Sequence, residues 1–513
     1  MKNLKYIFLT VFSLIAASSC SDFEELNTNP DLATTVPSDM IATQVLKDTY
    51  RFWNPNPTDY ATGNLWTKHT SRLETTPNGG QYYNPYPYSG FGNFKKLTDL
   101  KRMAEFSIGL PTEPSYKGLA LFLKAYWGFN MTVDLGDIPY SEAGMAEEGI
   151  TQPKYDKQAD VFVAILKDLQ DAEALFATGE NFSGDIMYGG DVTKWRKLCN
   201  TMQLKVIQTI SKKATAEQKA RFAAIVSANN LMTGNDDNLA LKFSTNTNAT
   251  YPFWSGENMR LITAGSKLLV DNLKLLNDRR LFYFVDPAKS LIDGGKLQSD
   301  FTAYEGAPSE LAPENLALGR SLNQYSLVNL RYTIKRDGDP ALKTTYSEQC
   351  FIIAEAIEEG WVAGDAKAYY ENGVKAQLAY YKDIPYAVNP GETVAHGMPI
   401  DQAYIDGYFT GEAAYKTGGT KLDREKQIWM QRWLIDYWQG NQNYYATFLR
   451  TGYPVFPLDP ATSQNPEDKT KYPTRLKYDT GEQVTNPVNY KAAIDSQYGG
   501  FDGINEIPWY LKN

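Results

Sequence analysis

Histidine and cysteine are scarce in this chain of 513 residues, which has only two His, His69 and His396, and three Cys. Histidine is the commonest general base near neutral pH and a frequent zinc ligand, so its scarcity counts against His-based catalysis and His-ligated metal sites. The H-E-x-x-H, G-x-S-x-G, G-x-G-x-x-G, P-loop and C-x-x-C patterns are also missing, which disfavours metalloprotease, serine hydrolase, nucleotide-binding and redox functions. We therefore predict no catalytic residue, no cofactor and no metal site. An α-helical glycoside hydrolase, using two of the 60 acidic residues, stays as the enzymatic alternative.

No apolar run in the chain approaches the length needed to span a membrane. The most informative short run lies at the N-terminus. Lys2 and Lys5 precede the apolar stretch 6–15, and small residues follow it up to Cys20. This run is too short to span a bilayer, and its flanks are those of a secretory signal peptide over residues 1–19. A Cys directly after small residues is typical of bacterial lipoproteins, so we expect Cys20 to be lipidated. The acidic residues at 22, 24 and 25 resemble the surface-export signals of Bacteroidetes lipoproteins.

These features predict an outer-membrane protein that is anchored by lipid and faces the cell exterior. Residues 20–40 would form the tether of this anchor. The net charge of the whole chain is −9, and removal of residues 1–19 takes away two Lys and makes the charge −11. A chain this acidic is a poor partner for nucleic acid or for an anionic lipid surface. With Cys20 lipidated, Cys199 and Cys350 remain, and their apolar surroundings predict buried free thiols.

Helical periodicity dominates the rest of the chain. Apolar residues recur at steps of three and four in 115–135, where Tyr126, Asn130 and Val133 belong to one face. Thr345 and Glu348 form a T-x-x-E capping box before a helix, and a second helix follows at 366–381, which makes a pair of roughly tetratricopeptide length. Other helices are predicted at 158–177, 192–211 and 423–439. We predict an all-α fold in which tetratricopeptide-like helix pairs carry long irregular loops, with a single domain over residues 41–513.

Tyrosine is abundant: the chain has 35 Tyr beside 23 Phe and ten Trp. Long Gly-, Pro-, Asn- and Tyr-rich loops are expected at 54–64, 75–93, 232–258, 283–325, 386–420 and 451–490, and loops this long are usually functional. The stretch 78–91 contains Tyr82, Tyr83, Tyr86 and Tyr88. Tyr offers flat apolar rings with polar tips at little rotamer cost, so we predict that these four residues bind ligand. The alternative is a loop packed on its own helices or on a protein partner.

Other aromatic and polar residues give weaker signals. Trp53, Trp66 and Trp254 are further candidate ligand contacts, although single aromatic residues are more often part of a core. Trp429, Trp433 and Tyr437 recur at steps of four and are predicted to pack between helices. A structural role is expected for His69, and His396 carries no signal. The pair Asp236 and Asp237 lacks EF-hand spacing, so a solvated turn is expected rather than a Ca²⁺ site.

Seven stretches, taken in order, resemble the SusD/RagB family of outer-membrane nutrient-binding lipoproteins, and in particular its second, SusD-like branch. They span nearly the whole chain after Cys20. The stretches are L-N-T-N-P at 26–30, V-D-L-G-D-I-P-Y-S-E-A at 133–143, M-Y-G-G-D at 187–191 with K-W at 194–195, S-E-Q-C-F-I-I-A-E-A at 347–356 with G-W at 360–361, I-W-M-Q-R-W at 428–433, R-T-G-Y-P at 450–454, and P-T-R at 473–475 with Glu482 and Asn486.

The resemblance implies an α-helical fold with a loop-rich ligand face and no enzymatic activity. It also implies that the protein acts as a lid on a TonB-dependent transporter of the SusC type. Such a lid protein captures an oligomeric nutrient at the cell surface and releases it into the transporter. A glycan is the family's usual ligand, and an oligopeptide is the alternative that we keep open. An adhesion or structural surface protein is a third possibility. The seven stretches do not specify which residues bind ligand in this family. The candidate site residues are therefore the aromatic side chains of the expected loops.

Overall fold

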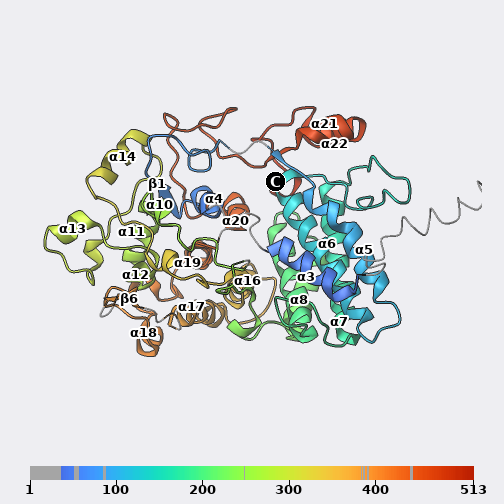
Figure 1. The fold of residues 1–513 in the computed structure, drawn as a ribbon, viewed down its shortest axis with the longest axis horizontal. Coiled ribbons are helices and arrows are strands. Elements are labelled where there is room, and N and C mark those ends of the chain that lie inside the picture. Colours follow the sequence, from blue (N-terminus) through green and yellow to red (C-terminus); the bar gives the residue numbers. More distant parts are fainter. Residues whose placement is uncertain are drawn as a thin grey trace, which may run out of the picture.

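The computed structural model describes residues 36–50, 57–84, 88–247, 249–382, 384, 387–389, 392–439 and 443–513. Over these residues the fold is dominated by helices, and the strands are two to four residues long and pair in four two-stranded sheets. The all-α prediction is confirmed. Figure 1 shows two halves side by side, with α16 (Tyr346–Glu358) near the boundary between them. None of the described helices is both long and apolar enough to cross a bilayer.

The half drawn on the right of Figure 1 is a bundle of long helices. Its helices are α3 (Ser38–Tyr50), α5 (Leu97–Phe106), α6 (Glu113–Leu135), α7 (Gln158–Thr178), α8 (Val192–Thr209) and α9 (Ala216–Ala228), with α21 (Thr480–Thr485) and α22 (Pro487–Tyr498) above them. Helix α7 packs on both α6 and α8. Asp191 caps α8 by accepting hydrogen bonds from the backbone N–H groups of Thr193 and Lys194, which confirms the predicted start of this helix.

The other half has shorter helices joined by long connections. Its helices are α4 (Pro57–Trp66), α10 (Glu257–Arg260), α11 (Lys267–Leu275), α12 (Arg280–Phe284), α13 (Lys289–Asp293), α14 (Pro313–Ser321), α15 (Arg331–Ile334), α17 (Ala366–Lys382), α18 (Gln402–Gly407), α19 (Lys421–Leu434) and α20 (Asn443–Thr451). The strands are β1 (Thr70–Arg72) with β4 (Thr263–Gly265), β2 (Tyr88–Ser89) with β8 (Lys477–Tyr478), β3 (Leu239–Leu241) with β5 (Ala341–Thr344), and β6 (Ala387–Asn389) with β7 (Glu392–Thr393). Among these four strand pairs of the described chain, β2 and β8 run parallel and the other three pairs are antiparallel.

Most predicted helices are confirmed, but the loop prediction at 54–64 is wrong because α4 occupies most of it. The predicted pair of helices is α16 and α17, which pack against each other. The capping box before α16 is only half formed. Thr345 accepts from the backbone N–H of Glu348 at 3.0 Å, whereas the Glu348 carboxylate turns away to Lys205 at 3.0 Å and Arg432 at 3.2 Å. Ion pairing in the interior therefore replaces the reciprocal cap.

Each half has its own large hydrophobic cluster, and α16 contributes to both. Ile352 and Ile353 lie in the cluster around α6 to α8, while Phe351 and Ala354 lie in the cluster around α11, α12 and α17. The single domain over 41–513 stays a prediction, and α3 already begins at Ser38. Cys199 and Cys350 are buried free thiols, as predicted, and burial raises the pKa of both.

Buried ion pairs between α16 and three neighbouring helices join the two halves. Glu348 and Glu355 on α16 meet Lys205 from α8, Arg432 from α19 and Arg450 from α20, with Arg450 at 2.5 Å from Glu355. Burial alone would raise the pKa of both carboxyls, but the neighbouring cations outweigh it and hold each pKa below its usual value. The paired charges are therefore ionised in the folded protein and fix the relative position of four helices.

Candidate functional site

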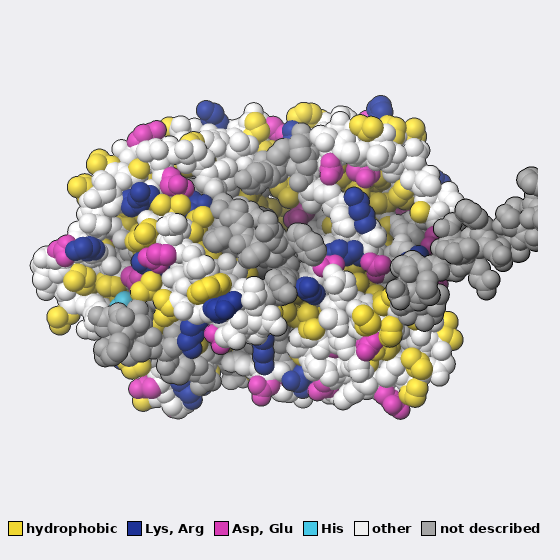
Figure 2. Space-filling view, in the orientation of Figure 1, with side chains coloured by type: hydrophobic (Ala, Val, Ile, Leu, Met, Phe, Trp, Pro, Cys, Tyr) yellow, Lys and Arg dark blue, Asp and Glu magenta, His cyan; other side chains and the backbone are white. Residues whose placement is uncertain are grey.

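A cavity of about 500 Å³ lies where the two halves meet. Figure 2 shows the surface hollowed in this region, between the parts that Figure 1 labels α4 and α6. The lining residues are Thr62, Gly63, Trp66, Tyr126, Phe129, Asn130, Val133, Asp134, Lys205, Thr209, Arg432, Tyr445, Ala446, Thr447, Leu449, Pro473, Thr474, Arg475, Leu476 and Tyr510. A volume of this size falls within the range of small-molecule sites, which are concave, rich in apolar rings and furnished with a few polar groups.

The aromatic side chains of the cavity are held in place by neighbouring rings. Trp66 packs edge to face against Tyr445, with ring centroids 5.3 Å apart, and against Tyr83 at 5.9 Å. The Tyr445 hydroxyl donates to the carbonyl of Pro473 at 2.9 Å. Ring pairs of this geometry add stability beyond area burial and remove rotamer freedom. Trp66 and Tyr445 therefore form a rigid aromatic wall.

The cations of the lining already have carboxylate partners. Lys205 and Arg432 belong to the ion pairs beneath α16, and Arg475 contacts Asp502 at 2.5 Å. Asp134 differs, because no side-chain hydrogen bond or ion pair to it is found within the described chain, and burial raises the pKa of its carboxyl to about 7. The cavity thus contains one acidic group without a counter-charge.

Two further polar groups in the lining lack partners in the described part of the chain. They are the hydroxyl of Tyr510 and the Nη2 atom of Arg475, both buried. Buried polar groups are almost always hydrogen-bonded, so unpaired ones mark places where a bound molecule or water completes the network. Together with Asp134 they give the cavity three polar groups that can hold a ligand.

The predicted site residues are only partly brought together. Trp66 lines the cavity, and Tyr83 supports Trp66 from behind. Tyr82 and Tyr83 are themselves buried: the Tyr82 hydroxyl donates to the carbonyl of Leu311 at 2.7 Å, and the Lys68 ammonium lies 4.1 Å from the Tyr83 ring centre. Both rings thus pack inside the protein, and a direct ligand contact by either stays a prediction.

The remaining predicted site residues lie elsewhere or outside the described residues. Trp254 is 38% exposed and lies outside the cavity lining, with the Arg336 guanidinium 5.2 Å from its ring centre. Tyr88 is in β2, and its side chain is outside the described part of the structure. Trp53, Tyr86 and Cys20 lie outside the described residues. Their ligand-binding and lipidation roles also stay predictions.

Several lining residues were not predicted as site residues. Tyr126, Asn130 and Val133 belong to the helical face recognised from the sequence, where they were expected to pack like any other stripe. The polar Asn130 within an apolar stripe was the available signal. Asp134 falls in the family-like stretch 133–143 but was not marked there as a ligand contact, and Tyr510 carried no local signal, since only the tertiary fold brings residues so far apart in sequence to one cavity.

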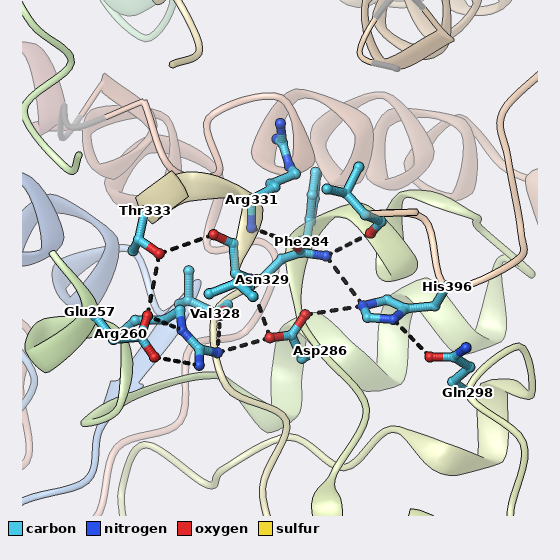
Figure 3. Close-up of polar contacts among 12 residues, drawn as sticks. Glu257, Arg260, Phe284, Asp286, Gln298, Val328, Asn329, Arg331, Thr333 and His396 are labelled. Atoms are coloured by element: carbon cyan, nitrogen blue, oxygen red, sulfur yellow. Dashed lines mark hydrogen bonds and ion pairs between the residues drawn. The ribbon is translucent and has the colours of Figure 1, made fainter. Parts of the chain in front are cut away.

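A second polar cluster surrounds His396, away from the cavity lining (Figure 3). The Asp286 carboxylate lies 3.0 Å from His396 Nε2 and accepts from Arg260 Nη1 at 2.8 Å, and Arg260 forms a bidentate pair with Glu257. Asn329 donates to the carbonyl of Val394 at 2.9 Å. The cluster connects segments that are remote in sequence. The imidazole of His396 therefore takes part in structural hydrogen bonds instead of facing solvent alone.

The pair Asp236 and Asp237 also has a structural setting. Asp237 is 5% exposed, contacts Lys197 at 2.9 Å and accepts from the backbone N–H of Thr233 at 2.8 Å, so the turn is an ion-paired one rather than the solvated turn that was expected. The described residues contain no group of three or more His, Cys, Asp or Glu placed to hold a metal ion.

Comparisons with known proteins agree with this architecture. A SusD homologue of Bacteroides fragilis is 34% identical, covers 93% of this chain and 100% of its own, and superposes with a TM-score of 0.87. An outer-membrane protein of Bacteroides vulgatus described as involved in nutrient binding is 27% identical, with the same coverages and a TM-score of 0.82. A chitin-binding protein is 25% identical over 93% of this chain and 99% of its own, with a TM-score of 0.71.

A search of curated proteins gave no match. The family profile that matches is the SusD-like one, described as starch-binding and associating with the outer membrane, and it matches residues 30–479. The match extends over most of the chain and over both halves of the fold. The chain therefore belongs to the SusD-like family of outer-membrane-associated binding proteins.

Proposed function

We propose that this protein captures an oligomeric nutrient, a glycan in the first instance, in the cavity between its two halves. The observation that carries the proposal is the rigid aromatic wall of Trp66 and Tyr445 facing unpaired polar groups. Flat apolar rings bind the faces of sugar rings, while a few polar groups fix orientation. The family description as starch-binding and the chitin-binding relative favour a glycan over other ligands.

Delivery to a SusC-like TonB-dependent transporter completes the proposed role. A lipid on Cys20 and the tether up to residue 40 would hold the binder beside such a transporter in the outer membrane, on the exterior face. Tethering raises the effective concentration of one partner around the other without any new contact. The proposed role is non-enzymatic: among the described residues, Asp134 is the one acidic group of the lining, whereas glycoside hydrolysis uses two carboxyl groups flanking the bond.

An oligopeptide ligand is the second candidate, because aromatic walls and unpaired hydrogen-bonding groups also suit peptide side chains and backbones. Calorimetry against libraries of oligosaccharides and oligopeptides distinguishes the two. Binding to oligosaccharides alone would support the glycan proposal, and binding to oligopeptides alone would replace it. Measurable turnover of either library would contradict a purely binding role.

The partner and the anchor are tested in the native membrane. Solubilised protein should co-purify with a large outer-membrane transporter, and a Cys20→Ala protein should move from the membrane fraction to the soluble one. Membrane retention of the Cys20→Ala protein would contradict lipid anchoring at this residue, and purification without any transporter would contradict the proposed delivery.

A further inference from the structure

We propose that the cavity recognises a protonated aliphatic amine, and that Asp134 is the residue that binds it. This inference rests on the proposed function, because it assigns ligand chemistry to the same cavity. Asp134 lies near the C-terminal end of α6 (Glu113–Leu135), and its backbone carbonyl accepts from Leu476 N–H at 2.8 Å. The backbone is thus fixed while the carboxyl group has no protein partner within the described residues.

The surrounding charges favour a cation over an anion. Each cation of the lining already contacts a carboxylate: Lys205 at 3.0 Å, Arg432 at 3.2 Å and Arg475 at 2.5 Å. The Nη2 atom of Arg475 has no partner in the described chain, but an anionic ligand that binds it would enter a space shared with the unpaired carboxyl group of Asp134. An ammonium ion would instead supply the counter-charge that the half-buried Asp134 lacks, and pairing stabilises a carboxylate that is largely withdrawn from water.

The aromatic lining favours the same ligand. Tyr126, Phe129 and Tyr445 line the cavity together with Trp66, and the negative face of an aromatic ring attracts a cation within about 6 Å. Tyr510 lies near enough to Asp134 for the carboxyl charge to add to the effect of burial in raising the pKa of the Tyr510 hydroxyl. This hydroxyl has no hydrogen-bond partner in the described chain, and it can accept a second N–H of the same ammonium group.

The amine can come from a sugar or from a peptide, so the probes are chosen in pairs. They are the trimer of glucosamine and its fully N-acetylated counterpart, and trialanine with a free and with an acetylated N-terminus. Within each pair, acetylation replaces charged amines by neutral acetamides, at every sugar of the trisaccharide and at the N-terminus of trialanine. Calorimetry at pH 7 should show that one or both free amines bind at least about tenfold more tightly than the acetylated partner. The pair that shows this difference identifies the source of the amine.

Substitutions in the cavity, with one control outside it, test whether Asp134 is the residue that binds the amine. Asp134→Asn keeps the side-chain shape and should lower the affinity of the free-amine probe by about tenfold or more, with the acetylated probe changed by less than about twofold. Asp99→Asn is the matched control, since Asp99 is exposed on α5 (Leu97–Phe106) and outside the cavity lining. Tyr510→Phe removes only the unpaired hydroxyl and should cost the amine probe a few-fold in affinity.

Equal binding of free and acetylated probes, or equal loss of both in the Asp134→Asn protein, would overturn the amine assignment and leave nutrient capture in the cavity intact. Preferential binding of a uronic acid trimer would overturn it too. Binding of glycans and peptides that no cavity substitution changes would instead contradict the proposed capture site itself.

Discussion

The indole ring of Trp433 lies flat against the imidazole of His69, with ring centroids 4.4 Å apart and planes 12° from parallel. Two hydrogen-bond contacts support the stacked rings. The indole Nε1–H of Trp433 donates to the backbone carbonyl of Thr67 at 2.8 Å, and His69 Nε2 lies 2.8 Å from the backbone carbonyl of Trp433. Trp433 therefore joins α19 to the turn that follows α4 at residues 67–69, so this ring packs on a turn rather than between two helices. The expected structural role of His69 is confirmed.

Acid should weaken this contact. Burial lowers the pKa of His69 to about 3, whereas an unfolded His titrates near 6.5, so the unfolded state binds more protons between these values and stability falls as pH drops. We expect His69→Gln to cost about 2–4 kcal/mol at pH 7.5, through the lost ring stacking and hydrogen bonds. The deficit should shrink by about 2–3 kcal/mol at pH 4.5. Denaturant unfolding at both pH values measures this, and a pH-independent deficit would contradict the buried neutral imidazole.

Asp134 should show the opposite pH dependence. Its folded pKa of about 7 exceeds the usual value for Asp, so its protonated form stabilises the fold at low pH and this contribution is lost as pH rises towards 7. Asn cannot ionise, so the stability of the Asp134→Asn protein relative to the wild type should increase by up to about 3 kcal/mol between pH 4 and pH 8. Thermal unfolding across this range measures the change. The exposed Asp99→Asn control should stay level, and a level curve for both variants would contradict the desolvated carboxyl.

The buried ion pairs should contribute far more than surface pairs of similar length. Removing Glu355 leaves Arg450 buried without its partner at 2.5 Å, so Glu355→Ala should destabilise the protein by about 3–5 kcal/mol. Glu148→Ala is the control, because Glu148 contacts Lys101 at 2.8 Å on the exposed surface, where solvent screens the pair and the expected cost is far smaller. Similar costs for both variants, in urea titrations, would mean that the charges between the halves are not desolvated.

Gly128 in α6 leaves the space that is filled by the ring of Tyr140, the last residue of the D-I-P-Y stretch at 137–140. A Cβ atom on Gly128 in α6 would lie 2.3 Å from a ring carbon of Tyr140, whose hydroxyl donates to Asp168 at 2.7 Å. Gly128→Ala should therefore cost about 1–3 kcal/mol by overpacking, although Ala is the better helix former. Gly407→Ala in α18 meets no atom within 4 Å and should be neutral or slightly stabilising. A stabilising Gly128→Ala in thermal unfolding would contradict the close approach of Tyr140.

The sequence predicted the parts of the fold that depend on local pattern. The apolar spacing in 115–135 and the helix start predicted at 192 correspond to α6 and α8, because helix faces depend on residues three or four apart. Helix α4 was missed because Gly63 and Asn64 lower helix propensity, and tertiary packing on Tyr83 and Tyr445 compensates.

The candidate site depends on long-range assembly and was mostly missed. The composition of the Tyr-rich loop was correctly noted, but composition does not say whether a ring faces solvent, and Tyr82 and Tyr83 turn inward. Asp134 and Tyr510 meet only because the C-terminal segment returns to the end of α6. A carboxyl left without a partner is a property of the folded interior, so no local pattern could have indicated it.

One comparison of variants shows whether ligand binding depends on the cavity or on the exposed aromatic surface. Calorimetry with maltohexaose and chitohexaose as probes should compare the wild type with Trp66→Phe, which trims the cavity wall, and Trp254→Phe, the same change at an exposed ring outside the lining. We predict that Trp66→Phe weakens binding of the recognised probe by about three- to tenfold, roughly 0.6–1.4 kcal/mol, while Trp254→Phe leaves it unchanged. Weakening by Trp254→Phe alone would contradict capture in the cavity.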